Sequence, residues 1–329
     1  MKALVYKGPE RLEFQDMPDP VPLGEEQLVK VDSVGICGSD MHAFLGHDER
    51  RPAPLILGHE VSGTIVEGER EGQRVTVNPL VGCGKCLACV SGRDNLCPER
   101  KIISMPPKEG GFAQYISMQM ENLTLVPESF SLEKSCMVEP IACGWHAVRL
   151  AKAVLESQAP GIQALVIGGG AIGVGSALSL IAQGIQNVTV IESNQMRRNF
   201  LSSGEIFSVI APDSLTDGDQ FDLVIDAVGF AQTRATASKA IRPGGAIMHI
   251  GLGSSEGGLD IRRATLQEIS FIGTYTYTAA DFRATAAAMF DGRLGALDWY
   301  ETRPLESGAQ SFADIRSGRV AAPKIILKP

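Results

Sequence analysis

A glycine-rich turn between an apolar strand and a helix constrains the fold of this 329-residue chain more than any other feature. Residues 164–175 read ALVIGGGAIGVG and place Gly168, Gly170 and Gly173 in the G-x-G-x-x-G spacing. In this context the first glycine makes a tight turn, the second lets the backbone approach a pyrophosphate, and the third lets the helix pack closely on the strand. The pattern predicts a dinucleotide-binding unit, and a tightly turned structural unit without a ligand is the alternative.

Apolar strands and helical segments alternate around this turn. Helices are expected at 171–184 and 195–204, and strands at 164–168, 187–193, 207–211, 221–229, 245–253 and 268–278. Strands that alternate with helices in this way indicate a parallel, doubly wound sheet, the Rossmann arrangement.

Glu192 ends the strand that follows the glycine-rich helix, nineteen residues beyond Gly173. A carboxylate there accepts hydrogen bonds from the adenosine ribose hydroxyls and repels a 2′-phosphate, which favours NAD over NADP. Arg197 and Arg198 are close enough in sequence to hold such a phosphate, so the alternative stays open. The expected cofactor contacts are Gly168, Gly170, Ile172, Gly173, Glu192, Arg197, Val228 and Gly251.

The first 135 residues have a different character. Short runs of β-branched residues between Gly, Pro and Asp turns predict β-structure there, and a helix is expected at 140–155 with a short connection at 157–161 behind it. The tail has one helical segment (281–292) and a strand-like run (324–328) that we expect to complete the first domain. Two domains suit a chain of this length. The expected bounds are 1–147 with 282–329 for one domain and 148–281 for the other.

Four of the seven cysteines lie within fifteen residues, at Cys83, Cys86, Cys89 and Cys97, in a lobe expected at about 80–100. Short spacings let one loop wrap a tetrahedral ion, with glycines as permissive backbone. Four thiolates saturate zinc and leave no position for a substrate, so a structural zinc site is expected. The spacing disfavours the alternative, a group of buried free thiols.

A second set of metal-binding side chains comes from separate segments and comprises Cys37, His59, Glu60 and Glu139. Each has an ordinary alternative, as a core thiol, a hydrogen-bonded histidine or a helix cap. Catalytic zinc takes three protein ligands of mixed S, N and O type and keeps one position open, and this set provides such ligands. Because adjacent residues on a strand point to opposite faces, His59 and Glu60 can both reach one metal only if the chain bends.

Together these motifs resemble the zinc-containing medium-chain dehydrogenases, and most of all their sorbitol, xylitol and galactitol dehydrogenase branch. The resemblance covers essentially the whole chain. It rests on the glycine-rich turn, the cysteine lobe and the motifs Cys37-Gly38-Ser39-Asp40-x-His42, Gly58-His59-Glu60-x-x-Gly63, Gly110-Gly111-Phe112-Ala113 and Glu139-Pro140. It implies a GroES-like β-barrel catalytic domain joined to a Rossmann domain, an active site between them, and a homodimer or homotetramer. The family usually has a helix where only residues 213–220 separate two strands here.

The resemblance also implies roles for single residues. Cys37 and His59 would be zinc ligands, with Asp40 supporting His59. Polyol dehydrogenases use the residue that matches Glu60 as a further ligand, whereas many alcohol dehydrogenases have a cysteine where Glu139 stands. Two anionic ligands neutralise Zn²⁺ and a third would weaken it as a Lewis acid, so one glutamate is expected to bind at a time.

A proton relay follows from the same motif. Ser39 would take the alcohol proton, and His42 would pass it to solvent. The alternatives are a serine that caps a turn and a histidine that lies on the surface.

The expected function is zinc- and NAD-dependent oxidation of a secondary alcohol, such as a sugar alcohol, to the ketone. The enzyme alternatives are L-threonine 3-dehydrogenase and a general secondary-alcohol dehydrogenase, and the non-enzyme alternative is a zinc-stapled dinucleotide-binding protein. The zinc-free quinone and enoyl reductases of the same superfamily lack the cysteine lobe and the Cys37/His59 pair, so this sequence argues against that class. Two positions differ from the polyol dehydrogenases. Ala43 replaces an aromatic residue, and Tyr275-Thr276-Tyr277 replaces a Phe-Arg-Tyr run. These differences argue against sorbitol itself as the substrate.

Composition excludes several other partners. The formal net charge is −8 with both signs interspersed, which argues against nucleic acid or an anionic membrane surface. The chain has neither a signal-peptide pattern nor an apolar stretch of transmembrane length, which predicts a cytosolic protein. In such a reducing compartment, crowded cysteines indicate metal binding rather than disulfides. A cytoplasmic protein with two zinc ions per chain and NAD is therefore expected.

Overall fold

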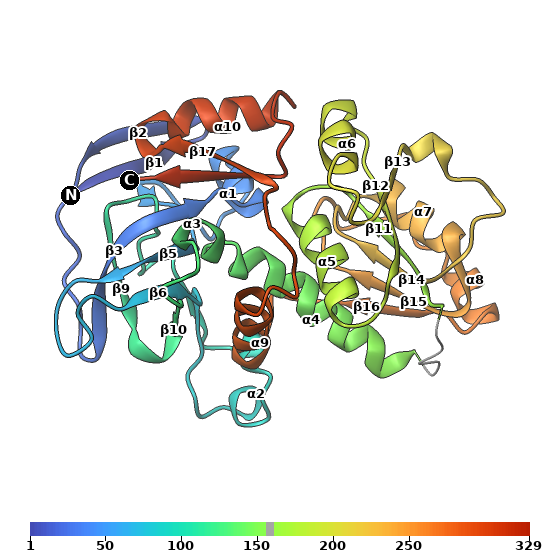
Figure 1. Cartoon of the computed structure of the whole chain (residues 1–329), viewed down its shortest axis with the longest axis horizontal. Helices are drawn as coiled ribbons and strands as arrows, with labels where there is room; N and C mark the ends of the chain where they lie inside the picture. Colours follow the sequence, from blue (N-terminus) through green and yellow to red (C-terminus); the bar gives the residue numbers. More distant parts are fainter. Residues whose placement is uncertain (156–160) are drawn as a thin grey trace.

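The computed structural model describes residues 1–155 and 161–329, and Figure 1 shows two bodies joined side by side. A β-rich body holds both chain ends, and an α/β body holds the middle of the chain. Helix α4 (Val138–Val154) runs from one body into the other, and α9 (Ala279–Phe290) packs against it. Within the described residues, no helix combines the length and the apolar character needed to cross a bilayer.

Six parallel strands form the sheet of the α/β body, in the order β13-β12-β11-β14-β15-β16. They are β11 (Gln163–Ile167), β12 (Asn187–Ile191), β13 (Ser208–Ile210), β14 (Phe221–Asp226), β15 (Ile241–His249) and β16 (Ser270–Gly273). Alternate residues of β11 enter two different cores, so both faces of the sheet are covered. The predicted doubly wound sheet is confirmed, and its order reverses beside β11, where such sheets bind ligands.

Four helices belong to this body, namely α5 (Ala171–Ala182), α6 (Gln195–Ser202), α7 (Ala231–Ala240) and α8 (Ile261–Leu266). The sequence pattern predicts α5 and α6 but not α7 or α8. Helix α7 buries Arg234 and three small residues, so its sequence carries no apolar stripe. Between β13 and β14 the chain makes a 3₁₀ turn (Pro212–Ser214) in place of an α-helix, as expected.

Seven strands of the β-rich body share one sheet, in the order β10-β6-β5-β3-β18-β17 with β9 paired to β3. They are β3 (Glu26–Gly35), β5 (Glu60–Ile65), β6 (Arg74–Val77), β9 (Tyr115–Gln119), β10 (Leu123–Leu125), β17 (Tyr300–Pro304) and β18 (Lys324–Lys328). A smaller sheet contains β2 (Arg11–Asp16), β1 (Lys2–Gly8) and β4 (Leu55–Ile56). Because β18 pairs antiparallel with β3, the predicted return of the tail to the first domain is confirmed.

The prediction of one helix and one strand in the tail is wrong. Strand β17 and helix α10 (Gly308–Arg316) lie between α9 and β18. Strand β17 reads YETRP and has no fully buried residue, and α10 buries only Gly308, Ser311 and Phe312, so neither shows a clear apolar period. Of the predicted connection at 157–161, residues 157–160 lie outside the described residues.

Small residues bring α4 and α5 into close contact. A Cβ at Gly144 would lie 2.6 Å from the Ser176 backbone, and a Cβ at Gly175 would lie 3.0 Å from Ile141 Cα. Helix α4 also contacts β5, so one helix connects the glycine-rich turn to the strand that begins at Glu60. The helix predicted at 140–155 is confirmed and starts two residues earlier.

Candidate active site

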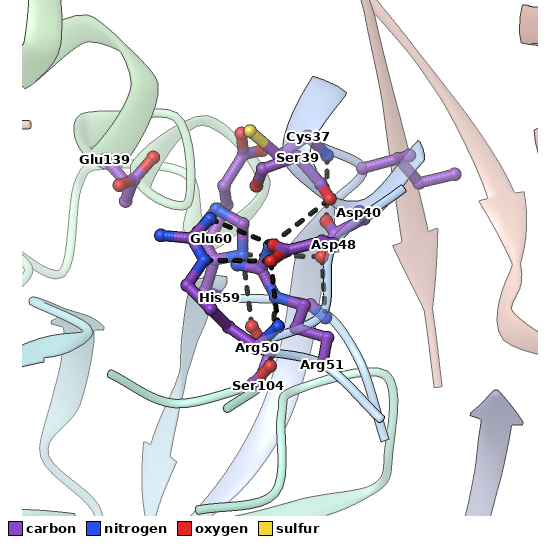
Figure 2. Close-up of polar contacts among 12 residues, drawn as sticks. Cys37, Ser39, Asp40, Asp48, Arg50, Arg51, His59, Glu60, Ser104 and Glu139 are labelled. Atoms are coloured by element: carbon purple, nitrogen blue, oxygen red, sulfur yellow. Dashed lines mark hydrogen bonds and ion pairs between the residues drawn. The ribbon is translucent and has the colours of Figure 1, made fainter. Parts of the chain in front are cut away.

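Three of the candidate catalytic ligands meet at the start of α1 and β5. Cys37 precedes α1 (Gly38–Phe44), His59 immediately precedes β5, and Glu60 is the first residue of β5. One ligand atom from each residue lies within 4.8 Å of the others, although they come from two separate segments (Figure 2). A thiol, an imidazole and a carboxylate form a donor set that zinc accepts, so these residues fit the ion.

The chain bends before His59, as the sequence requires. Gly58 has φ +90°, and a Cβ there would lie 2.6 Å from the Phe112 ring. His59 lies outside the strand that begins at Glu60, so the two side chains do not alternate as strand neighbours do. The expectation that a bend brings both side chains to one place is confirmed.

The buried carboxylate of Asp40 ties the two segments together. It accepts hydrogen bonds from the amides of Cys37 (3.0 Å) and Gly58 (3.1 Å) and lies 3.4 Å from His59 Nδ1. Burial alone would raise the pKa of Asp40, but the charges of His59 and Arg51 lower it below its ordinary value. An anion beside Nδ1 orients the imidazole and leaves Nε2 as the ring nitrogen available to a metal, which agrees with the expected support of His59.

Glu60 pairs with a buried lysine from the far end of the chain. Lys324 Nζ donates to both carboxylate oxygens of Glu60, at 2.7 and 2.6 Å, and to the Ile36 carbonyl at 2.8 Å. Burial alone would lower the pKa of Lys324, but Glu60 and Cys37 raise it. Gly35 leaves room for the carboxylate, because a Cβ there would lie 1.9 Å from Glu60 Oε2.

Glu139, in the first turn of α4, does not belong to the 4.8 Å group found among the described residues, and Figure 2 shows it apart from Cys37. Tyr277 donates a hydrogen bond from Oη to Glu139 Oε1 at 2.7 Å, and both side chains are buried. Burial, together with the charge of Glu60, raises the pKa of Glu139. Of the two glutamates, Glu60 is therefore the one that lies next to Cys37 and His59.

The two residues of the expected proton relay lie on α1. Ser39 is half-buried, and its carbonyl accepts a hydrogen bond from Arg51 Nη1 at 3.3 Å. His42 is exposed. No hydrogen bond joins the two side chains in the described part of the chain, so the relay stays a prediction.

The cysteine lobe is formed by one short segment of the chain. The sulfurs of Cys83, Cys86, Cys89 and Cys97 lie within 4.8 Å of one another around helix α2 (Leu87–Val90). Backbone hydrogen bonds from Lys85 and Cys86 lower the pKa of Cys83 to about 7, whereas burial raises the pKa of Cys89 to about 12. Four sulfur donors in this arrangement fit a tetrahedral zinc without an open position.

The glycine-rich turn has the shape that a dinucleotide requires. Gly168 has φ +102°, a Cβ at Gly170 would meet nothing within 4 Å, and a Cβ at Gly173 would lie 1.7 Å from Gly168 O. The first glycine therefore makes the turn, the second faces open space, and the third lets α5 pack on β11. These residues fit a pyrophosphate at the N-terminus of α5.

Glu192 faces this turn from the end of β12. Its carboxylate accepts hydrogen bonds from the Gly169 amide (2.9 Å) and the Asn194 amide (2.7 Å). Arg197 Nη1 lies 3.7 Å from the same carboxylate, and Arg198 Nη1 donates to the Glu192 carbonyl at 2.8 Å. Both arginines thus lie beside Glu192, and the carboxylate lies closest to the turn.

The remaining expected cofactor contacts border the same turn. A Cβ at Gly168 would lie 2.5 Å from Val228 Cγ2, and a Cβ at Gly251 would lie 2.1 Å from the Val228 backbone. Ile172 lies in the first turn of α5. The structure therefore brings together Gly168, Val228 and Gly251, which follow the strands β11, β14 and β15.

Two site residues escape the sequence analysis. Lys324 stands in the apolar run PKIIL, and a lone cation in a buried strand requires a buried acid, but its partner lies 264 positions away. The bond from Tyr277 to Glu139 spans 138 positions and has no local signal.

Comparison with known families decides the class of enzyme. Residues 24–128 match the alcohol dehydrogenase GroES-like domain, and residues 171–291 match the zinc-binding dehydrogenase domain. The chain is 33% identical to L-galactonate-5-dehydrogenase of Escherichia coli (strain K12), with 90% of this chain and 89% of the relative covered. The chain belongs to the zinc-binding, medium-chain alcohol dehydrogenase family. The expected resemblance, fold class and enzyme class of this dehydrogenase are confirmed.

Other relatives of this dehydrogenase agree. Sorbitol dehydrogenase of Bacillus subtilis (strain 168) is 31% identical over 84% of this chain and 82% of the relative. An acetophenone reductase from Geotrichum candidum in complex with NAD superposes with a TM-score of 0.87 at 26% identity, covering 100% of this chain and 97% of that one. An Escherichia coli oxidoreductase of unknown specificity reaches a TM-score of 0.90 at 25% identity, covering 99% and 98%. Zinc and NAD, the expected cofactors, fit this family.

Proposed function

We propose that this dehydrogenase oxidises a secondary hydroxyl of a polyol to a ketone, with NAD as the hydride acceptor. The observation that supports it most is the convergence of Cys37, His59 and Glu60 within 4.8 Å. Zinc held by these residues would supply a Lewis acid for the alcohol oxygen. Two relatives above 30% identity are named for L-galactonate and sorbitol, both polyhydroxylated compounds.

The protein residues around the metal have separate tasks in this proposal. Cys37, His59 and Glu60 hold the catalytic zinc, and Lys324 balances the charge of Glu60. Glu139, held by Tyr277, borders the site from α4 as the second acid of the centre. Two charged carboxylates near one ion would reduce its positive charge, and the pairing of Glu60 with Lys324 limits that effect.

Proton release and cofactor binding use the other predicted residues. Ser39 accepts the alcohol proton, and His42 passes it to solvent. Gly168, Gly170 and Gly173 admit the pyrophosphate, and Glu192 binds the adenosine ribose. Ile172, Arg197, Val228 and Gly251 line the rest of the cofactor site, and Cys83, Cys86, Cys89 and Cys97 hold a second, structural zinc.

We further propose a homodimer or homotetramer in the cytoplasm, with domains at 1–147 plus 282–329 and at 148–281. Strand β16 ends its sheet, and Leu252, Ile261, Leu266 and Phe271 are exposed apolar residues in the segments around it. A sheet edge with exposed apolar side chains favours association. None of the seven cysteines forms a disulfide in the described part of the chain, which suits a reducing compartment.

The test is the reduction of NAD and NADP by metal-replete protein with polyols, simple secondary alcohols and L-threonine. We expect NAD reduction with a polyol and its loss after zinc is removed by a chelator. Faster oxidation of threonine or of a simple alcohol would replace the polyol assignment. No cofactor reduction with any substrate, in protein that still binds NAD, would favour a zinc-stapled dinucleotide-binding protein.

A further inference from the structure

Arg50, beside the candidate active site, has no task in the proposed chemistry. Its side chain is 58% exposed, and it donates through Nε and Nη2 to the two carboxylate oxygens of Asp48, at 2.8 and 3.0 Å. The neighbouring Arg51 is buried and donates through Nη1 to the same Asp48 at 2.8 Å. The Asp48 carboxylate therefore accepts hydrogen bonds from two guanidinium groups, and only that of Arg50 is exposed to solvent.

Arg51 fixes this pair to the metal centre. Its Nε donates to the Ser104 carbonyl at 3.0 Å, and Ser104 Oγ lies 3.5 Å from His59 Nδ1. Its Nη1 also reaches the carbonyl of Ser39, two residues after Cys37. Figure 2 shows Arg50 and Asp48 joined by two dashed lines beside His59. The exposed guanidinium of Arg50 is thus held on a buried support rather than on a free loop.

Arg100 places a second exposed guanidinium near the same centre. It lies 4.9 Å from the centroid of the Tyr275 ring, and its Nε donates to Tyr275 Oη at 3.3 Å. Two residues further on, Tyr277 bonds to Glu139. Arg100 therefore borders the segment that reaches the candidate zinc site from the side of Glu139.

Arg50, Arg51 and Arg100 have few carboxylates within ion-pair distance, although the net charge of the chain is −8. Among the described residues, Asp48 is the only carboxylate within 4.0 Å of Arg50 or Arg51, and none lies that close to Arg100. Arg50 and Arg51 thus share one anion. Guanidinium groups with unused donors bind carboxylates and phosphates through charge-assisted, often paired hydrogen bonds.

We propose that Arg50 and Arg100 select a polyol that carries an anionic end group, a carboxylate or a phosphate, over the neutral polyol. The inference rests on the proposed function and names its substrate class. The reacting hydroxyl lies at the metal centre, and the anionic end lies at the two arginines. Arg51 does not contact the substrate and acts as a positioning residue for Arg50.

The experiment compares three compounds of one configuration, the alditol, the aldonate and the alditol phosphate, as substrates of the zinc-loaded enzyme with NAD. We expect kcat/KM to be at least about tenfold higher for one of the anionic compounds than for the alditol. The anionic compound with the higher kcat/KM identifies the end group. In Arg50→Gln and Arg100→Gln this ratio falls toward one, mainly through KM. The ratio is unchanged in Arg11→Gln, which removes an exposed arginine that pairs with Glu13 of the same strand, β2.

Two outcomes would overturn this inference and leave the proposed function unaffected. The first is a kcat/KM for the alditol equal to or higher than that for the anionic compounds. The second is a preference for an anionic compound that persists in both Arg50→Gln and Arg100→Gln. Absence of NAD reduction with every polyol would overturn the proposed function. The arginines are tested separately by calorimetric titration of the zinc-loaded, NADH-bound protein with the aldonate and the alditol phosphate. Weaker binding in Arg50→Gln and Arg100→Gln supports the inference, and equal or absent binding in all proteins contradicts it.

Discussion

The two candidate zinc sites of this dehydrogenase depend on the fold to different degrees. All ligands of the lobe come from residues 83–97, and three of the four cysteines are half-exposed. The catalytic centre is mostly buried and takes its ligands from two segments. Its support comes from Lys324, which lies 264 positions from Glu60, and from Tyr277, which lies 138 positions from Glu139.

This difference follows from what each site has to do. A closed site of four thiolates needs only a flexible loop of the right spacing. A catalytic site keeps one position open and buries mixed ligands, so its carboxylates need counter-charges and hydrogen bonds that a local loop does not supply. The lobe is therefore encoded locally, and the centre depends on tertiary structure.

The largest expected effect comes from removing one ligand at each site. His59→Ala should reduce zinc from two ions to one per chain and lower kcat/KM at least about a thousandfold, since a bound metal supplies several kcal/mol of transition-state stabilisation. Cys89→Ser should also leave one zinc but mainly lower the thermal unfolding midpoint. Elemental analysis and kinetics check both variants, and an active His59→Ala enzyme would contradict the assignment.

Lys324→Met tests the dependence of the centre on distant residues. The substitution leaves the buried charge of Glu60 unpaired, and breaking a buried pair in this way costs about 3–5 kcal/mol. Lys324→Arg is the matched control, because it keeps the charge and should lose less. Chemical unfolding of both variants measures the effect. A Lys324→Met protein as stable as the wild type would show that the pair adds nothing to the centre.

Asp40→Asn tests the support of His59 without touching a ligand. Loss of such a supporting anion lowers metal affinity about 10–100-fold. In competition with a chelator, followed through enzyme activity, the variant should lose its catalytic zinc at a lower chelator concentration than the wild type. The lobe zinc should be lost at the same chelator concentration in both proteins. Parallel loss of both ions in the variant would argue against a specific role of Asp40.

The smallest effect concerns a buried network without metal, where Asp281 accepts hydrogen bonds from His146 Nδ1 at 2.7 Å and from Arg149 Nε at 2.6 Å. Burial alone would raise the pKa of Asp281, but these bonds hold it well below its ordinary value. Asp281→Asn should cost about 1–3 kcal/mol at neutral pH.

A depressed carboxyl pKa gives stability that is present above the unfolded value and is lost as the pH falls toward the native value. The difference between wild type and Asp281→Asn should therefore stay constant from pH 8 to about 5 and shrink below about pH 4. Unfolding free energies measured at several pH values check this. A difference that grows on acidification would have the wrong sign.

The parts of the molecule that the sequence predicts well are those set by local geometry. The spacing of Gly168, Gly170 and Gly173 and the cysteine lobe each follow from constraints within a few residues. Helices α7 and α10 escape because they bury Arg234 and Ser311 rather than an apolar stripe. The sequence leaves open which glutamate lies beside Cys37 and His59, because the position of Glu60 next to them depends on tertiary structure. The pairing of β18 with β3, which brings Lys324 to Glu60, is equally nonlocal.

The central claim is that this dehydrogenase holds two zinc ions with different ligands. Zinc X-ray absorption of the Cys89→Ser variant, whose lobe ion is removed, tests it most directly. One sulfur at about 2.3 Å with nitrogen and oxygen neighbours at about 2.0–2.2 Å is the predicted result. A spectrum with sulfur neighbours alone, or a variant that holds no zinc, would contradict the account.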